Sequence, residues 1–178
     1  MNWANRLTIL RIILAPVFIS AVLYGKYGLA LAVFLFAAVT DGLDGYIARS
    51  RDQKTVLGTI LDPIADKLLI GSAYISFCIV SGVPEYLRLP AYVPIIVISR
   101  DVFILLGAVI IYMLKGGIDV KPSYLGKVTT VFQMLTVIAL LLRFVHSSWL
   151  WNFTTFLTLV SGLDYLRTGS KQINDKLH

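Results

Sequence analysis

The sequence predicts an all-α integral membrane protein, a bundle of six transmembrane helices with both termini in the cytoplasm. Of its 178 residues, 57% are hydrophobic and only 15% are charged, and the mean hydropathy is +0.79. These values are well above those of a soluble domain, which needs more polar surface to cover its core. The hydrophobic residues also gather in six runs, each close to the length of about 20 residues that crosses a bilayer as a helix. Finally, the basic residues gather on one side of these runs.

The six runs are separated by short polar breaks. The runs cover residues 7–25, 27–49, 57–81, 91–114, 124–145 and 148–166. The breaks are Gly25-Lys26, Ser50–Thr55, Val83–Glu85, Lys115–Pro122 and His146-Ser147. No segment resembles a soluble domain or a linker, so residues 1–178 are expected to form a single membrane domain.

Each run has a feature that supports its assignment. The first contains Arg11 and no small-residue cleavage site follows it, which favours a membrane span over a cleavable signal. The second and third carry four aspartates, and the fourth carries Arg100 in an otherwise apolar stretch. The fifth begins close to Lys127. Beside the start of the sixth lie Trp149 and Trp151, where an interfacial aromatic belt would place them.

The distribution of basic residues predicts the topology. Six spans bring both termini to one side of the membrane. On that side lie Arg6, Arg11, Arg49, Arg51, Lys54, Lys115, Lys121, Lys127, Arg167, Lys171 and Lys176, and on the other lie Lys26, Arg88 and Arg143. Because cytoplasmic loops are enriched in Lys and Arg, both termini are predicted to be cytoplasmic. The net charge of +6 is therefore attributed to membrane topology, and no nucleic-acid partner is expected.

Four aspartates lie in the second and third runs, although an ionised carboxylate at membrane depth costs roughly 2.5–3.5 kcal/mol. The two runs form an antiparallel hairpin whose turn centres near Gln53. Asp44 and Asp62 each lie nine residues from that centre, while Asp41 lies twelve before it and Asp66 thirteen after it. Equal distances along two helices place each pair at equal depth. Spacings of three and four residues keep each pair on one helix face, so all four carboxylates can converge.

A cluster of carboxylates without nearby His or Cys suits Mg²⁺, Mn²⁺ or Ca²⁺ rather than zinc or copper. Two such ions also suit phosphoryl chemistry, because they neutralise a pyrophosphate. Gly42, Gly45 and Gly58 leave room for a bulky ligand, and Arg49 and Arg51 offer phosphate-binding cations. The alternatives are a polar network between packed helices and a divalent-cation transporter or channel. A transporter would need metal-binding residues along the whole membrane path, whereas these acids concentrate on one side.

The spacing of these residues resembles the signature of the CDP-alcohol phosphatidyltransferase family. The matching pattern is Asp41-x2-Asp44-Gly45-x2-Ala48-Arg49-x8-Gly58-x3-Asp62-x3-Asp66. Further similar segments are Asn5-x2-Thr8-x2-Arg11, Ser99-Arg100-Asp101, Gly126-Lys127-x-Thr129 and Ser161–Tyr165. The chain looks most like the branch that holds phosphatidylglycerophosphate synthases and CMP-forming cardiolipin synthases.

The resemblance implies a six-helix membrane enzyme, usually homodimeric, that moves a phosphatidyl group from CDP-diacylglycerol to an alcohol and releases CMP. It also implies a bacterial inner membrane, with the active site facing the cytoplasm, and two bound Mg²⁺ or Mn²⁺ ions. The implied metal ligands are Asp41, Asp44, Asp62 and Asp66. Of these, Asp66 would also be the catalytic base for the acceptor hydroxyl. The implied CDP-diacylglycerol site consists of Gly45, Ala48, Arg49 and Gly58.

The acceptor is expected to be glycerol 3-phosphate, with phosphatidylglycerol as the alternative. Arg100 and Lys127 are the candidate cations for its phosphate. The alternative role for Arg100 is a salt bridge to Asp101 or snorkelling. The alternative role for Lys127 is that of an interfacial anchor. At the positions of Arg100 and Asp101 in this chain, the glycerophosphate enzymes typically have Arg followed by Glu. They also have an extra Arg near the position of Gly107 and a Lys just after the position of Lys127. Ser-Arg-Asp looks like the cardiolipin synthases, whereas the stretch Ser161–Tyr165 looks like the glycerophosphate enzymes.

Overall fold

The computed structural model describes residues 3–51, 56–80, 84–115 and 123–174, and these form six α-helices and a short 3₁₀ helix. The helices are α1 (Trp3–Leu23), α2 (Tyr27–Arg51), α3 (Val56–Ile79), η1 (Glu85–Leu87), α4 (Tyr92–Lys115), α5 (Tyr124–Leu141) and α6 (Ser147–Asn174). Within them, the description of side chains leaves out residues 3–8, 41–51, 56–64, 66, 86, 108–115 and 169–174. The described residues contain no strand, so the prediction of six helices in an all-α fold is confirmed.

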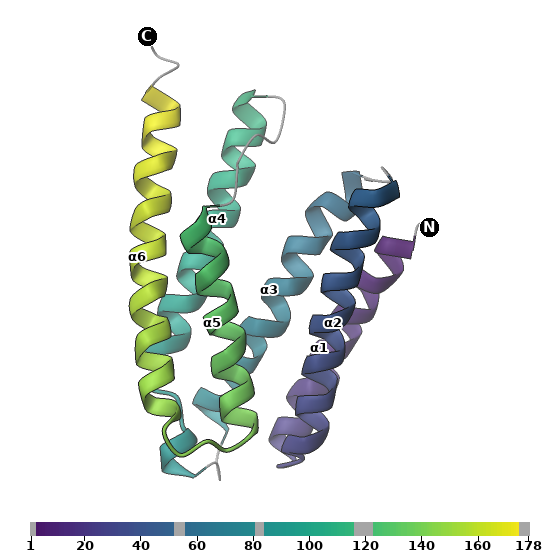
Figure 1. Cartoon of the computed structure of the whole chain (residues 1–178), viewed down its shortest axis with the longest axis vertical. Coiled ribbons are helices and arrows are strands. Elements are labelled where there is room, and N and C mark those ends of the chain that lie inside the picture. Colours follow the sequence, from purple (N-terminus) through teal and green to yellow (C-terminus); the bar gives the residue numbers. More distant parts are fainter. Residues whose placement is uncertain (1–2, 52–55, 81–83, 116–122, 175–178) are drawn as a thin grey trace.

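The third helix lies between two groups of helices (Figure 1). On one side α1 packs against both α2 and α3, and on the other α6 packs against α4 and α5. The two groups meet where α3 contacts α4 and α5, and where α2 contacts α5. The helices run alternately up and down, so that α1 begins and α6 ends toward the same end of the bundle.

Small residues allow α1, α2 and α3 to approach closely. Ala15, Ala30, Ala37 and Ala73 are at most 1% exposed. Aromatic rings fill the remaining space, because the rings of Phe18 and Phe34 are centred 6.0 Å apart and those of Tyr27 and Phe77 are stacked at 6.3 Å. Alternating small and large side chains give the interdigitated packing that holds these helices together.

Threonines line the contact between α5 and α6. The hydroxyls of Thr136 and Thr154 lie 2.8 Å apart and are hydrogen-bonded to each other. Thr136 also reaches the carbonyl of Phe132 one turn back, at 2.9 Å. Because each buried hydroxyl finds a partner, this polar contact can lie inside an otherwise apolar bundle.

Two hydrogen bonds fix how α4 lies against α6. Tyr92 Oη donates to Asn152 Oδ1 at 2.7 Å, and Tyr165 Oη donates to the carbonyl of Ile104 at 3.1 Å. These pairs are 60 and 61 residues apart in the sequence, so the two helices run parallel and stay in register. This register decides which α6 side chains face the candidate site residues of α4.

Four of the six helices end within two residues of the hydrophobic runs that predict them, but α5 and α6 end further away. The fifth run extends to 145, but α5 ends at Leu141, because Arg143 adopts a left-handed backbone conformation (φ 56°) that ends a helix. The Arg143 guanidinium lies 4.7 Å from the centre of the Tyr27 ring, a cation–π contact that offsets part of the backbone strain. The sixth run ends at 166, whereas α6 continues to Asn174.

Within the described part of the chain, one helix, Tyr124–Leu141, is both long enough and apolar enough to cross a membrane. Shorter apolar stretches are Ile9–Leu23, Tyr27–Thr40 and Lys67–Ile79. The number of helices is therefore confirmed, while the six membrane crossings and the cytoplasmic position of the termini stay predictions.

Candidate functional site

The candidate residues for metal and CDP-diacylglycerol all lie on α2 and α3. On α2 lie Asp41, Asp44, Gly45, Ala48 and Arg49, and on α3 lie Gly58, Asp62 and Asp66. Both helices end or begin beside the predicted turn, α2 at Arg51 and α3 at Val56. The side chains of all eight residues lie outside the described part of the structure, so the convergence of the carboxylates stays a prediction. Among the side chains that are described, no group of three or more His, Cys, Asp or Glu could hold a metal.

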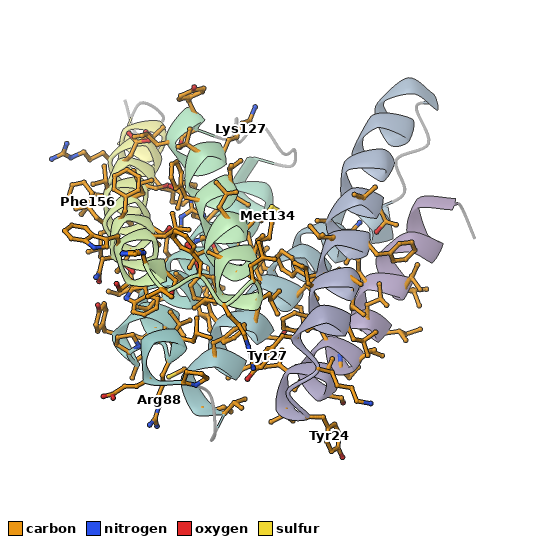
Figure 2. All side chains as sticks on the ribbon, turned by 60° about the horizontal axis from the view of Figure 1, so that its bottom comes forward. Tyr24, Tyr27, Arg88, Lys127, Met134 and Phe156 are labelled. Atoms are coloured by element: carbon orange, nitrogen blue, oxygen red, sulfur yellow. The ribbon has the colours of Figure 1, made fainter. Side chains whose placement is uncertain are left out.

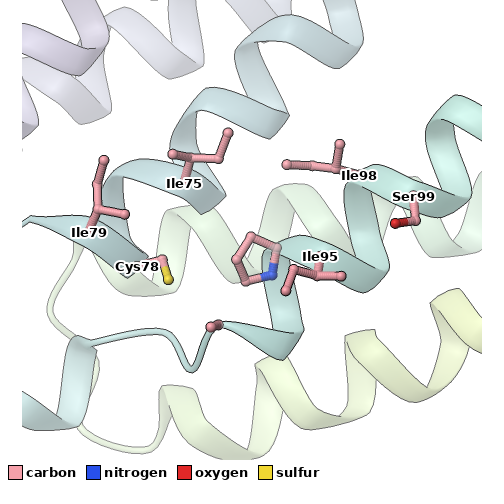
Figure 3. A pocket seen from close by; sticks show the side chains of 8 residues that line it. Ile75, Cys78, Ile79, Ile95, Ile98 and Ser99 are labelled. Atoms are coloured by element: carbon pink, nitrogen blue, oxygen red, sulfur yellow. The ribbon is translucent and has the colours of Figure 1, made fainter.

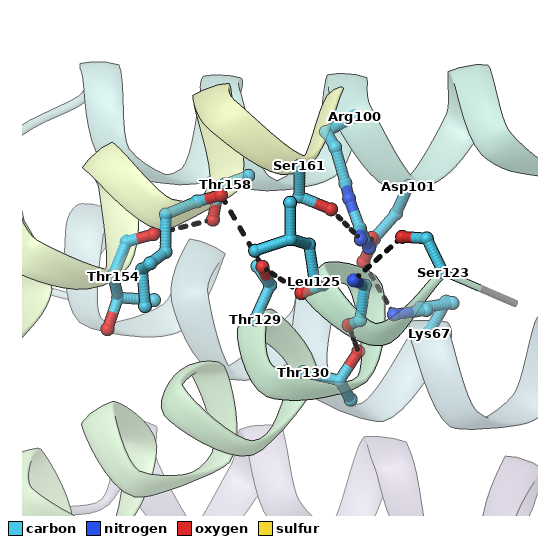
Figure 4. Close-up of polar contacts among 12 residues, drawn as sticks. Lys67, Arg100, Asp101, Ser123, Leu125, Thr129, Thr130, Thr154, Thr158 and Ser161 are labelled. Carbon is cyan, nitrogen blue, oxygen red and sulfur yellow. Dashed lines mark hydrogen bonds and ion pairs between the residues drawn. The ribbon is translucent and has the colours of Figure 1, made fainter. Parts of the chain in front are cut away.

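Arg100 is a buried cation in the middle of α4, with 7% of its side chain exposed. Its Nη1 donates to Asp101 Oδ1 at 2.8 Å, and its Nη2 donates to Ser161 Oγ at 2.6 Å (Figure 4). Its Nε is buried and has no hydrogen-bond partner among the side chains that the structure describes. The guanidinium is therefore held on one side while one of its donors is still unsatisfied, at a cost in free energy that an added acceptor could remove.

A second cation, Lys67 of α3, shares Asp101 with Arg100. Its Nζ lies 3.1 Å from Asp101 Oδ2, so each carboxylate oxygen faces one cation. We call Lys67, Arg100, Asp101 and Ser161 the Arg100 cluster. Two positive charges and one negative charge leave the cluster with one excess positive charge. Arg100 and Asp101 are buried, whereas Lys67 is partly exposed. An excess charge that is largely removed from water is unfavourable unless a counter-ion accompanies it, which favours binding of an anion here.

The N-terminus of α5 lies against the same guanidinium. Ser123 caps this helix, its Oγ accepting from the backbone N–H of Gly126 at 3.0 Å. A Cβ at Gly126 would lie 3.2 Å from Arg100 Nη2, so the missing side chain lets the helix and the guanidinium approach. Because a helix N-terminus is itself a positive pole, its position beside Arg100 also favours an anion.

Three segments that the sequence analysis identified therefore meet in space: Arg100 and Asp101 of α4, Gly126 of α5 and Ser161 of α6. The ion pair of Arg100 with Asp101, which was the alternative role, is also present. The sequence analysis did not identify the partnership of Lys67 with Asp101 or that of Ser161 with Arg100. Helix spacing could not reveal them, because each joins two helices.

Lys127, the other candidate for the acceptor phosphate, is exposed and projects away from the bundle (Figure 2). It follows Gly126 directly, but the structure does not bring its ammonium group into the Arg100 cluster. Its ammonium group makes no hydrogen bond or ion pair with the described residues, while its backbone N–H donates to the carbonyl of Ser123 at 3.3 Å. It lies at the edge of the site, where it could meet a ligand that extends outward.

Tyr165 of α6 covers Gly107 of α4. Gly107 lies about two turns after Arg100, and Tyr165 lies one turn after Ser161. A Cβ at Gly107 would lie 2.6 Å from Tyr165 Oη and 2.9 Å from its Cε1, closer than real contacts allow. The Tyr165 hydroxyl is fixed in this place by its hydrogen bond to Ile104. A larger residue at 107 would therefore require Tyr165 to move.

A pocket of about 390 Å³ lies between α3 and α4, away from the aspartates (Figure 3). It is lined by Ile75, Cys78, Ile79, Ala91, Pro94, Ile95, Ile98 and Ser99. At 1.5 Å per residue, its nearest α3 residue is about 13 Å along the helix from Asp66. No charged side chain lines it, so it does not form part of the candidate site.

The fold and the arrangement of these motifs agree with a match of the sequence to a known family. Residues 1–160 match the CDP-alcohol phosphatidyltransferase family, and the chain belongs to it. The chain is thus a CDP-alcohol phosphatidyltransferase enzyme.

Its relatives include both kinds of enzyme that the sequence suggested. It is 33% identical to the CDP-diacylglycerol–glycerol-3-phosphate 3-phosphatidyltransferase of Aquifex aeolicus, over 97% of this chain and 98% of that protein. The protein of the same name from Bacillus subtilis is 33% identical, over 92% and 93% of the two chains. The CMP-forming cardiolipin synthase of Homo sapiens is 32% identical over 95% of this chain, but the match spans only 62% of that protein.

Proposed function

We propose that this enzyme transfers the phosphatidyl group of CDP-diacylglycerol to glycerol 3-phosphate and releases CMP. The Arg100 cluster carries the choice of acceptor, because it combines a buried guanidinium, one excess positive charge and an adjoining helix N-terminus. Two relatives that match over nearly their whole length bear the name of this reaction.

The protein works in a membrane, with the aspartate-bearing ends of α2 and α3 facing the cytoplasm. Large apolar side chains on the outside of the bundle support this proposal, since water would disfavour them and lipid would not. Examples are Ile95, Phe103, Phe156, Leu163 and Trp149, all more than half exposed. We place it in a bacterial inner membrane, as a homodimer, because the family resemblance implies both.

The acceptor phosphate binds at Arg100. Its Nη1 and Nη2 are already held by Asp101 and Ser161, so the guanidinium is oriented before the substrate arrives. Charge-assisted bonds from a guanidinium to phosphate are among the stronger hydrogen bonds in proteins. Lys127 meets the part of the acceptor that extends out of the bundle.

The metal ligands are Asp41, Asp44, Asp62 and Asp66. Four carboxylates, from two helices that are four residues apart in the sequence, form an all-oxygen donor set that fits two Mg²⁺ or Mn²⁺ ions. When bound, such ions neutralise the negative charge of the pyrophosphate. The cytidine and pyrophosphate lie against α2 and α3, at Gly45, Ala48, Arg49 and Gly58.

In the chemical step the acceptor hydroxyl oxygen forms a bond to the phosphorus that carries diacylglycerol. The bond from that phosphorus to the bridging pyrophosphate oxygen breaks, and CMP leaves with both electrons of that bond. The hydroxyl proton passes to the carboxylate of Asp66. Proton removal by a positioned base contributes about 10²–10⁴-fold to such reactions.

Phosphatidylglycerol is the second candidate acceptor, and the contact between Gly107 and Tyr165 favours it. If an additional arginine at this position helps to bind glycerol 3-phosphate, residue 107 itself cannot provide it without displacing Tyr165. Phosphatidylglycerol carries a phosphodiester with a single charge, so it requires fewer cations than the dianionic glycerol 3-phosphate.

A panel of acceptors tests the proposal. Purified protein receives labelled CDP-diacylglycerol together with glycerol 3-phosphate, phosphatidylglycerol, inositol phosphate or serine, each in a separate reaction. Chromatography of the lipid product is expected to show phosphatidylglycerophosphate with the first acceptor. Cardiolipin from the second, without product from the first, would establish the alternative.

A further inference from the structure

Asp101 is a buried carboxylate that joins two helices, and the proposed reaction gives it no role. It lies on α4 and is 9% exposed. Its Oδ1 accepts from Arg100 Nη1 at 2.8 Å, while its Oδ2 faces Lys67 Nζ of α3 at 3.1 Å. Both oxygens are therefore used, and each contacts a cation from a different helix (Figure 4).

The contact with Asp101 sets the direction of the Arg100 side chain. Consecutive residues on a helix project about 100° apart, so neighbours do not normally face each other. Arg100 nevertheless bends toward Asp101, and Ser161 holds its other terminal nitrogen at 2.6 Å. The two acceptors, Asp101 on α4 and Ser161 on α6, together define the plane of the guanidinium. A single acceptor would leave the guanidinium free to rotate about one hydrogen bond.

The second oxygen of Asp101 connects this guanidinium to the helix that bears the proposed base. Lys67 directly follows Asp66 on α3, so the ion pair with Asp101 holds this turn of α3 against α4. One carboxylate thereby fixes the orientation of the acceptor-binding cation and ties its helix to the turn that carries Asp66.

We propose that Asp101 is a positioning residue, which orients Arg100 toward the acceptor phosphate and keeps it in register with the turn of α3 that carries Asp66. This inference rests on the proposed function. A positioning role and a purely electrostatic role predict opposite effects on acceptor binding when Asp101 loses its charge. Replacing Asp101 by asparagine raises the net charge of the Arg100 cluster from one to two positive charges, and a purely electrostatic site would then bind an anion more tightly.

The test measures the KM for glycerol 3-phosphate and for CDP-diacylglycerol in the wild type, Asp101→Asn and Asp101→Glu. Because small misplacements of binding groups can cost up to about 100-fold, Asp101→Asn is expected to raise the KM for glycerol 3-phosphate roughly ten- to a hundredfold. The KM for CDP-diacylglycerol should not change, and Asp101→Glu should recover part of the loss. Glu85→Gln is the matched control, since it removes an exposed carboxylate on η1 and should change neither KM.

The double variant Lys67→Gln/Asp101→Asn covers the case in which Asp101→Asn does not fold, because it restores the net charge of the wild-type cluster. Its KM for glycerol 3-phosphate should still be raised. An unchanged or lower KM in Asp101→Asn, or a wild-type KM in the double variant, would overturn the positioning role.

The failure of the proposed function would look different. A wild-type protein that makes cardiolipin and no phosphatidylglycerophosphate has another acceptor, and the same comparison of KM values with phosphatidylglycerol then decides the role of Asp101. A wild type that is inactive with both acceptors would contradict the proposed function and the positioning role together.

Discussion

The guanidinium of Arg100 on α4 donates a 2.6 Å hydrogen bond to the hydroxyl of Ser161 on α6. Ser161 is 1% exposed and lies 61 residues further along the chain. Together with Asp101 it leaves the guanidinium little freedom to turn. The parallel register of α4 and α6 thus contributes directly to the proposed acceptor site.

Removing this hydroxyl should weaken the binding of the acceptor. In Ser161→Ala the loss of a bond worth about 1 kcal/mol should raise the KM for glycerol 3-phosphate roughly three- to tenfold. Thr158→Ala is the control, because it removes a buried α6 hydroxyl one turn earlier whose only partner among the described residues is the backbone of Thr154. Equal KM values for Ser161→Ala and the wild type would show that Ser161 does not orient Arg100.

The close approach of α5 to Arg100 gives a matched pair of glycine substitutions. In Gly126→Ala the new Cβ would lie 3.2 Å from Arg100 Nη2, so the guanidinium must shift and the KM for glycerol 3-phosphate should rise severalfold, on the order of 1 kcal/mol. In Gly162→Ala the Cβ would lie 3.6 Å from Arg100 Cγ, an ordinary contact with the stem of the same side chain. Gly162→Ala should therefore keep the wild-type KM. If the two variants behave alike, the position of the guanidinium is not what sets acceptor affinity.

The contact between Gly107 and Tyr165 should matter for stability. Gly107→Ala places a Cβ 2.6 Å from Tyr165 Oη, and such overpacking typically costs about 1–3 kcal/mol. Its thermal unfolding temperature in detergent should fall below that of the wild type. Adding Tyr165→Phe removes the atom that makes the closest contact, and the double variant should regain part of the loss. An unfolding temperature as high as that of the wild type in Gly107→Ala would mean that Tyr165 can move at little cost.

Loss of a proposed metal ligand should stop the reaction without unfolding the protein. Asp62→Asn keeps the volume of the side chain but removes its charge, so CMP release should be lost while the melting curve in detergent is retained. Excess chelator should likewise stop the wild type, with Mg²⁺ or Mn²⁺ restoring activity and Zn²⁺ serving poorly with all-oxygen ligands. Substantial CMP release by Asp62→Asn at saturating Mg²⁺, or by the wild type in excess chelator, would be incompatible with the metal assignment.

The helices could be predicted from the sequence because their apolar runs are long and the breaks between them are short. Hydrophobicity marks the apolar part of a helix and not its end, which is why α6 continues past the run that stops at 166. The end of α5 depends on a left-handed backbone at Arg143, a conformation that the sequence would suggest only for glycine or asparagine.

The candidate site could be predicted in part. Arg100 was identified because a cation in an apolar run is unusual, and the signature residues of α2 and α3 were identified from their spacing. The roles of Lys67, Ser161 and Gly126 could not be predicted in this way. Each depends on a side chain from another helix, and only the packing of α3, α5 and α6 around α4 brings these residues together.

Arg100→Gln tests most directly whether the Arg100 cluster binds the acceptor phosphate. A hydrogen bond to a charged group is worth about 1.5–3 kcal/mol, so its loss should raise the KM for glycerol 3-phosphate roughly ten- to a hundredfold. The KM for CDP-diacylglycerol should remain close to that of the wild type, because we propose that Arg49 and the aspartates, and not Arg100, bind that substrate. Equal increases in both KM values would show that Arg100 supports the whole fold, and an unchanged KM for glycerol 3-phosphate in an active enzyme would contradict the central claim.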